Sequence, residues 1–196
     1  MEKINFIKTF IPQGDFREKY EHGGMMVRHL AAVLDEKMGA YECYECTVPI
    51  GEYDEGEIQK AFAEFSAKMD ALKLKQAKAD KIAEITAYDT SSSVNGFMLN
   101  GLLVWLDKAT RVGLMNSTTI AKAAGQKTTT LWLGGIKLVV DCDKAIQLLS
   151  ALEMYALECF NVTASHKQAV SELTTIEEVE AYNYKAGYPK MLEMSV

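Results

Sequence analysis

The sequence has little that would direct the chain to a membrane or to nucleic acid. The longest apolar stretch of its 196 residues runs only from Phe97 to Leu106 and is interrupted by Asn100, so it is too short to span a bilayer. Lysine and arginine (21) are outnumbered by aspartate and glutamate (27), and no basic cluster stands out. The formal net charge is −6. We therefore expect neither a membrane nor nucleic acid as a partner.

The sequence also lacks the usual signatures of secretion, phosphate binding and metal binding. Residues 1–7 contain no long apolar signal segment, so we expect the chain to be made and kept in the cytoplasm. Gly134-Gly135 is not followed by the Lys-Ser/Thr of a phosphate loop. The three histidines, at positions 22, 29 and 166, lack the spacing of metal ligands. We expect no cofactor and no metal.

The four cysteines, Cys43, Cys46, Cys142 and Cys159, are expected to be free thiols in a reducing cytosol. Cys43 and Cys46 form a C-x-x-C motif, but they lie in a predicted strand, whereas a redox pair requires a helix N-terminus and a zinc site requires a second pair. Cys159 and His166 are seven residues apart and fall on one helix face. Two helical turns, ~10 Å, separate them, which is too far for an activated nucleophile.

The clearest single element is a helix over residues 57–88. Its first half carries apolar residues at alternating spacings of four and three, namely Ile58, Phe62, Phe65, Met69 and Leu72. This heptad pattern predicts a seam for a coiled coil, and these five residues are our candidate oligomerisation site. The alternative is that the helix lies along its own domain. Phe, Met and Ile on the seam do not choose between a dimer and a trimer.

The segments on either side of this helix predict an α+β fold in which helices dominate. Residues 1–56 read as a small mixed unit with a hairpin over 26–48, and Asp89 with the serines after it breaks the helix. In residues 89–196, Asn100-Gly101 and Gly134-Gly135 predict the turns of two hairpins. Three helices are expected: one over 108–124, a long one capped by Asp141 or Asp143, and a short one from Thr174-Thr175 to about Tyr184. The chain end after it is expected to be a tail.

The apolar residues of this C-terminal part are expected to form a core of hairpins packed on helices. The stripe of the long helix includes Tyr155, Cys159 and Phe160. Trp105 and Trp132 each lie in a predicted hairpin, where we expect them to be cross-strand core aromatics. The chain thus divides into residues 1–56, a connecting helix 57–88, and a domain 89–196.

From about Lys81 to Val170 the order of these features resembles an uncharacterised domain family that recurs at the C-terminal end of tailed-phage tail and tail-fibre-associated proteins. The residues that carry the resemblance are Ile82 and Ile85, Phe97-Met98-Leu99-Asn100-Gly101, Asp107 and Arg111, Ala123-Ala124-Gly125, Trp132, Asp141, and Ala156, Cys159-Phe160 and His166-Lys167-Gln168-Ala169-Val170. The family has no established catalytic residues, so the resemblance assigns none here.

Together these features predict a non-enzymatic structural protein of a bacteriophage or prophage tail. Such a protein would be synthesised in the host cytoplasm, reside in the virion tail, and bind itself, as a homo-oligomer, or other tail proteins. One alternative is a cytoplasmic assembly factor for tail fibres that is absent from the mature particle. A more remote alternative is a small cysteine hydrolase that uses Cys159 and His166.

Overall fold

The computed structural model describes residues 4–10, 16–19, 24–35 and 37–195. They form two compact units, residues 1–75 and 76–196, and the boundary falls inside one long helix. The predicted α+β class, with long helices and β-hairpins, is confirmed. The observed boundary differs from the predicted division at 57 and 89, because each part of this helix packs with the elements of its own unit.

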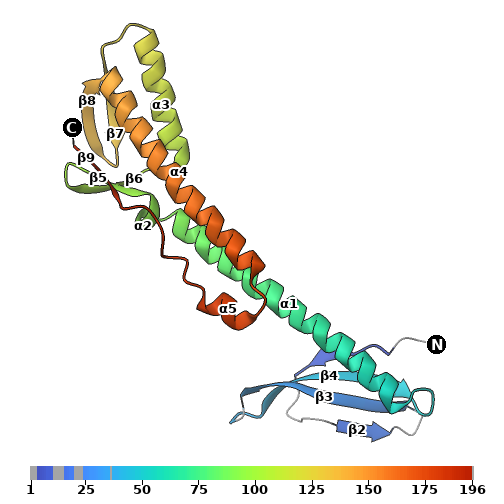
Figure 1. Ribbon diagram of the computed structural model, residues 1–196. Coiled ribbons are helices and arrows are strands. Elements are labelled where there is room, and N and C mark those ends of the chain that lie inside the picture. Colours follow the sequence, from blue (N-terminus) through green and yellow to red (C-terminus); the bar gives the residue numbers. More distant parts are fainter. Residues whose placement is uncertain (1–3, 11–15, 20–23, 36, 196) are drawn as a thin grey trace. The chain divides into compact units, whose positions relative to one another are not determined.

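The N-terminal unit is an antiparallel four-stranded sheet with the strand order β1-β4-β3-β2 (Figure 1). The predicted hairpin is present and pairs the two longest strands. His22 lies outside the described residues. The strands are β1 (Ile7–Thr9), β2 (Phe16–Lys19), β3 (Gly24–Asp35) and β4 (Ala40–Pro49).

Helix α1 (Glu55–Asp89) begins at a reciprocal cap. The Glu57 backbone N–H donates to the Asp54 carboxylate at 2.8 Å, and the Asp54 N–H donates to the Glu57 carboxylate at 2.9 Å. This pairing satisfies two of the amide groups that a helix start leaves free. The start therefore lies two residues earlier than the predicted residue 57.

The first half of α1 packs on one face of the sheet. Ile58 is buried, and Phe62, Phe65 and Met69 contact the same cluster. Its other members are Phe6, which precedes β1, and the sheet residues Val27, Tyr44, Cys46 and Val48. The Tyr44 and Phe65 rings meet edge-to-face with centroids 5.0 Å apart. Four of the five predicted seam residues thus have a partner within their own unit.

The C-terminal unit contains the two predicted hairpins. The first joins β5 (Gly96–Leu99) to β6 (Leu102–Trp105), and the second joins β7 (Thr128–Leu133) to β8 (Ile136–Asp141). Asn100 and Gly101 both have positive φ, 49° and 82°, as do Gly134 and Gly135. Both turns therefore have the backbone that their residue types predict.

Four helices complete this unit together with the last part of α1: α2 (Ser92–Asn95), α3 (Lys108–Ala123), α4 (Cys142–Glu172) and α5 (Ile176–Ala181). Helix α3 begins at the predicted residue, ends one residue before the predicted end, and packs beside α4. Asp141 holds the N-cap position of α4 but makes no side-chain cap bond. A capping box of Thr175 and Glu178 starts α5, which ends at Ala181 rather than near Tyr184.

The end of the chain is not a plain tail as predicted. Residues Leu192–Met194 form β9, which pairs in parallel with β5 and gives a sheet of order β6-β5-β9. The Asn100 N–H donates to the Met194 carbonyl at 2.9 Å, and Met194 is buried in the core. The partner strand lies almost a hundred positions earlier, so no local pattern announces this pairing. Within the described residues, none of the helices is long and apolar enough to cross a membrane.

Candidate functional site

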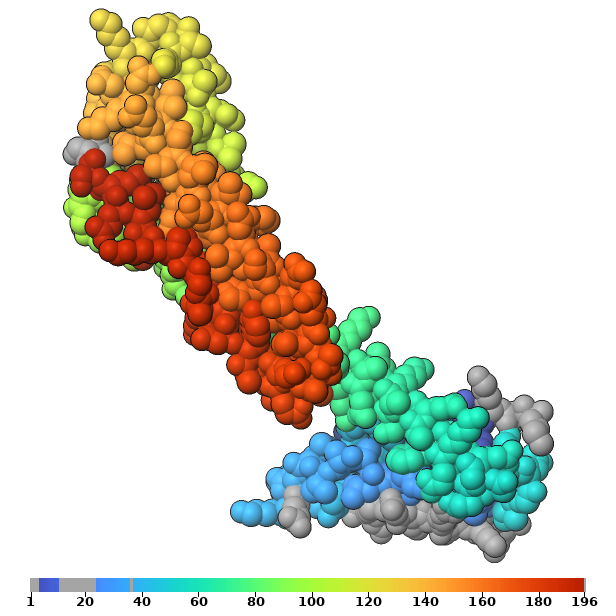
Figure 2. Space-filling model, viewed as in Figure 1, coloured from blue at the N-terminus to red at the C-terminus, as the bar shows by residue number. Residues whose placement is uncertain are grey.

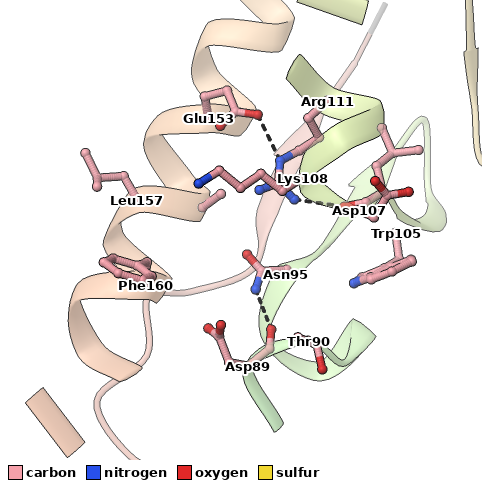
Figure 3. A pocket seen from close by; sticks show the side chains of 12 residues that line it. Asp89, Thr90, Asn95, Trp105, Asp107, Lys108, Arg111, Glu153, Leu157 and Phe160 are labelled. Carbon is pink, nitrogen blue, oxygen red and sulfur yellow. Dashed lines mark hydrogen bonds and ion pairs between the residues drawn. The ribbon is translucent and has the colours of Figure 1, made fainter. Parts of the chain in front are cut away.

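A groove of about 750 Å³ opens on the surface of the C-terminal unit (Figure 3). Three parts of the chain line it: the segment after α1, the link from β6 into α3, and the middle of α4. The lining residues are Asp89, Thr90, Asn95, Trp105, Leu106, Asp107, Lys108, Arg111, Glu153, Ala156, Leu157 and Phe160. Its volume is within the range of ~300–1,000 Å³ that is usual for sites that bind small ligands or short segments.

Arg111 fixes one wall of this groove. The Asp107 carboxylate accepts from the Thr110 N–H at 2.8 Å and so starts α3, which places Arg111 one turn into the helix. The guanidinium is buried, and its Nε donates to the Glu153 carboxylate at 2.9 Å while Nη1 donates to the Leu106 carbonyl at 2.8 Å. The side chain therefore ties α3, α4 and the β6–α3 link together.

The opposite end of the groove is fixed by a second set of polar contacts. The Asn95 side-chain amide donates to the Asp89 backbone carbonyl, and the Thr163 hydroxyl donates to the Asp89 carboxylate at 2.7 Å. Thr163 lies on α4, so this bond joins the end of α1 to α4. Both ends of the groove are therefore held by side chains with partners in the same unit.

The surface between these ends is apolar and accessible to solvent. Trp105 is 41% exposed, Leu157 49% and Phe160 59%. The α4 side chains, orange in the space-filling view, make up much of the visible surface of this unit (Figure 2). Exposed aromatic and aliphatic groups that gather over a groove favour a protein-binding surface over a solvated face.

Three predictions about core residues are wrong, and helix and strand periodicity explains them. Phe160 follows Cys159 by one position, about 100° around the helix, so it points outward when Cys159 faces the core. Trp105 and Trp132, 41% and 58% exposed, lie on the outer faces of their hairpins, and their buried neighbours are Val104 and Leu133. An alternation of side chains along a strand does not reveal which face is covered.

The structure gives Cys159 and His166 separate partners. The Cys159 thiol is buried and donates to the Val94 carbonyl at 3.4 Å, and its burial raises the pKa of the thiol. The two His166 ring nitrogens contact the Tyr182 hydroxyl at 2.8 Å and the Ala186 carbonyl at 2.9 Å. The imidazole therefore holds the segment after α5 rather than activating the thiol.

The remaining candidates for chemistry do not come together either. Cys43 and Cys46 are buried in β4 and form no disulfide, and their spacing of three directs them to opposite faces of the sheet. Among the residues that the structure describes, no group of three or more histidine, cysteine, aspartate or glutamate side chains has an arrangement that fits a metal ion. Of the predicted seam, only Leu72, 49% exposed, faces solvent, and self-association through the seam stays a prediction.

A family model matches residues 76–186, which is more than half of the chain, and its description is a domain of unknown function, DUF4376. The chain therefore belongs to this family, and the match begins at the first residue of the C-terminal unit. No curated protein matches the sequence, and no solved structure matches the fold. The expected membership of an uncharacterised domain family is thus confirmed, over a longer range than residues 81–170, and every residue of the groove falls within it.

Proposed function

We propose that this member of the DUF4376 family is a non-enzymatic structural component of a bacteriophage or prophage tail. It acts by binding other tail proteins or further copies of itself. The observation that carries the binding role is the preformed groove of the C-terminal unit with its exposed Trp105, Leu157 and Phe160. The order of features from Lys81 to Val170, which resembles a domain of phage tail proteins, supports the biological setting.

The composition of the groove favours a protein as its partner. Tryptophan and arginine are enriched among the residues that dominate binding energy at protein interfaces. Here the exposed Trp105 and the buried Arg111 both line the groove, and the contacts of Arg111 to Glu153 and Leu106 keep it in one position. A rigid wall reduces the entropy lost when a partner binds. The partner would gain apolar contacts while the wall keeps its shape.

The test is the composition of purified particles that carry variants of the groove. Leu157→Asp places a carboxylate on the apolar wall, and we expect this variant to fold and to be absent from particles. The matched control is Met154→Asp, because Met154 is 59% exposed on the same helix and does not line the groove. We expect the wild type and the control at stoichiometric levels by mass spectrometry. Equal incorporation of both variants would contradict the role of the groove.

The same groove also fits a second function, a cytoplasmic assembly factor for tail fibres. Such a factor binds a fibre segment and leaves before the particle is complete, so mass spectrometry would not find it in mature particles. Leu157→Asp would then lower the yield of infectious particles, while Met154→Asp would not. Presence of the wild type in the particle separates the structural role from the assembly role.

Self-association through α1 is a further part of the proposal, and Leu72 tests it. Phe62, Phe65 and Met69 pack on the sheet of their own unit, whereas Leu72 is half exposed. Leu72→Glu therefore leaves the packing on the sheet intact and adds a charge to the part of the seam that is open to another copy. We expect light scattering to give a multimer for the full chain and a smaller species for this variant. A wild-type monomer would refute the homo-oligomer.

A further inference from the structure

Strand β9 covers the edge of β5 that β6 leaves open. Leu192–Met194 pair in parallel with residues 97–99. Met194 is buried in the core of the C-terminal unit, and Leu192 packs against the same core, whereas Glu193 is exposed. The edge of β5 therefore accepts an extended segment in which an apolar, a polar and an apolar residue follow one another.

The connection to β9 places no turn constraint on this strand. A short turn at Asn100-Gly101 holds β6 beside β5, as in any hairpin. Strand β9 instead follows residues 182–191, which contain neither helix nor strand and run back from α5 to β5 (Figure 1). Because no local turn joins a parallel strand to its neighbour, another chain can supply the strand at this position.

The segment before β9 is attached to α4 by side-chain contacts. The two His166 ring nitrogens contact the Tyr182 hydroxyl at 2.8 Å and the Ala186 carbonyl at 2.9 Å. The Thr163 and Tyr188 hydroxyls lie 2.9 Å apart. These contacts, like the pairing of β9, form equally well when the segment comes from a second copy of the chain. An exchange of this segment between two copies therefore loses none of them.

The covered edge and the strand that covers it differ in their relation to the family. The family match over residues 76–186 includes β5 and ends before β9. The matched domain thus contains the edge but not the strand that pairs with it here. An open strand edge is a template for pairing with another strand.

We propose that the edge of β5 is a strand-binding site for a second copy of this chain: two copies exchange residues 176–194, and the β9 of each pairs with the β5 of the other. The chains cross at the link between α4 and α5, residues 173–175. The exchanged form repeats the contacts of the single copy, so the two forms differ mainly by the entropy of association. This cost falls where an assembly holds copies close together. The inference goes beyond the proposed function, because it involves neither the groove nor the α1 seam.

A mixture of two variants of the full chain, each with one added cysteine, tests the exchange. One variant carries Met98→Cys on β5 and the other Glu193→Cys on β9, and these positions lie opposite each other. Neighbouring strands are about 4.8 Å apart, which a disulfide can span. Because the added cysteines are on different chains, they meet only if β9 of one copy lies on β5 of another. The four native cysteines are buried, and the wild type gives the background.

Leu103→Cys is the matched control for Met98→Cys. Leu103 pairs with Met98 but lies on β6, on the side of β5 away from β9, and is 57% exposed. The variants are incubated together at high concentration, oxidised, and separated by electrophoresis without reductant. We expect at least about tenfold more disulfide-linked dimer with Met98→Cys than with Leu103→Cys, because paired strands hold the thiols together and collisions do not. The share of dimer should rise with the protein concentration during incubation.

The inference is overturned if the two mixtures give equal amounts of dimer, or none. A chain that carries both Met98→Cys and Glu193→Cys shows whether the disulfide can form, since in dilute solution it should close within one chain. Failure of this chain to form the disulfide would mean that β9 does not pair with β5, which also overturns the inference. None of these results depends on whether the protein is found in particles, so the proposed function is judged separately.

Discussion

Removal of the Tyr155 hydroxyl tests how much one buried hydrogen bond stabilises the C-terminal unit. The Tyr155 hydroxyl donates to the Val94 carbonyl at 2.7 Å and so joins α4 to α2, which lies 61 residues earlier. Both residues are buried. The Cys159 thiol donates to the same carbonyl at 3.4 Å. Tyr155→Phe keeps the ring in the core and removes only the stronger of these two bonds.

The expected loss of stability follows from what remains at the Val94 carbonyl. A buried acceptor that loses its partner costs about 1–3 kcal/mol. The thiol is a weak donor and keeps part of the interaction, so we expect Tyr155→Phe to lower the free energy of unfolding by about 1.5 kcal/mol. Addition of Cys159→Ala leaves the carbonyl without either donor. The loss in the double variant should therefore exceed the sum of the two single losses.

Tryptophan fluorescence during denaturant unfolding measures this effect in the full chain. The sequence has two tryptophans, Trp105 and Trp132, and both lie in the C-terminal unit, so the signal reports on that unit alone. Tyr184→Phe is the control, because the Tyr184 ring packs on Tyr88 but its hydroxyl has no hydrogen-bond partner in the described residues. A change below about 0.3 kcal/mol for Tyr155→Phe, or an equal change for the control, would refute the assigned role of the bond.

Three further variants or conditions probe other features. Burial raises the pKa of Glu42, but bonds from two lysines outweigh this effect, so the pKa in the folded protein lies below 4.5. The ionised Glu42 therefore contributes stability above about pH 4.5, and this contribution is lost as the pH falls through the pKa of the folded protein. Glu42→Gln should abolish this loss in thermal melts followed by circular dichroism. Burial raises the pKa of Tyr155 from 10.0 to about 12, so the C-terminal unit should lose stability as the pH rises between these two values. In the folded protein, the absorbance of the Tyr155 phenolate should appear only near the upper value. Gly134→Ala should cost about 1 kcal/mol more than Gly135→Ala in the same fluorescence assay, because both have positive φ but only the added Cβ at Gly134 would meet the buried Val104 side chain, at 2.9 Å; equal losses would contradict this.

The elements that the sequence predicts well are those that short-range chemistry determines. Asn100-Gly101 and Gly134-Gly135 adopt positive φ because asparagine and glycine tolerate it, and the hairpins follow from these turns. The limits of α3 follow from the Asp107 cap at its start and from Gly125 just beyond its end. Each of these signals lies within a few residues of the structure that it specifies.

The elements that the sequence predicts poorly depend on contacts between distant segments. Strand β9 forms because β5 has a free edge, and its three residues have no pattern of their own. The exposure of Trp105 and Trp132 depends on which face of each hairpin the helices cover. A sequence pattern gives the alternation of faces but not the identity of the buried one.

The candidate site depends both on local signals and on contacts between distant segments. Asp107 and Arg111 are among the residues that carry the family resemblance, and the cap that places Arg111 is local. The partner of Arg111, Glu153, lies 42 residues later and has no signal in its surroundings. The sequence pattern does not distinguish Leu157, and it places Phe160 in the core, since an apolar residue at the edge of a helical stripe has the same spacing whether it is buried or exposed.

Helix α1 shows why an apolar period alone does not identify a coiled coil. Repeats of 3.5 and 3.6 residues differ by only about 20° per heptad, so over the short stretch from Ile58 to Leu72 a seam for another helix and a face for a sheet look the same. The seam weakens after Leu72, and the family match begins at Gln76, the first residue of the C-terminal unit. The sheet and its covering face therefore lie outside the shared domain, whereas the groove lies wholly within it. A variant of the groove therefore tests the shared domain, whereas a variant of the α1 face on the sheet tests only the N-terminal unit.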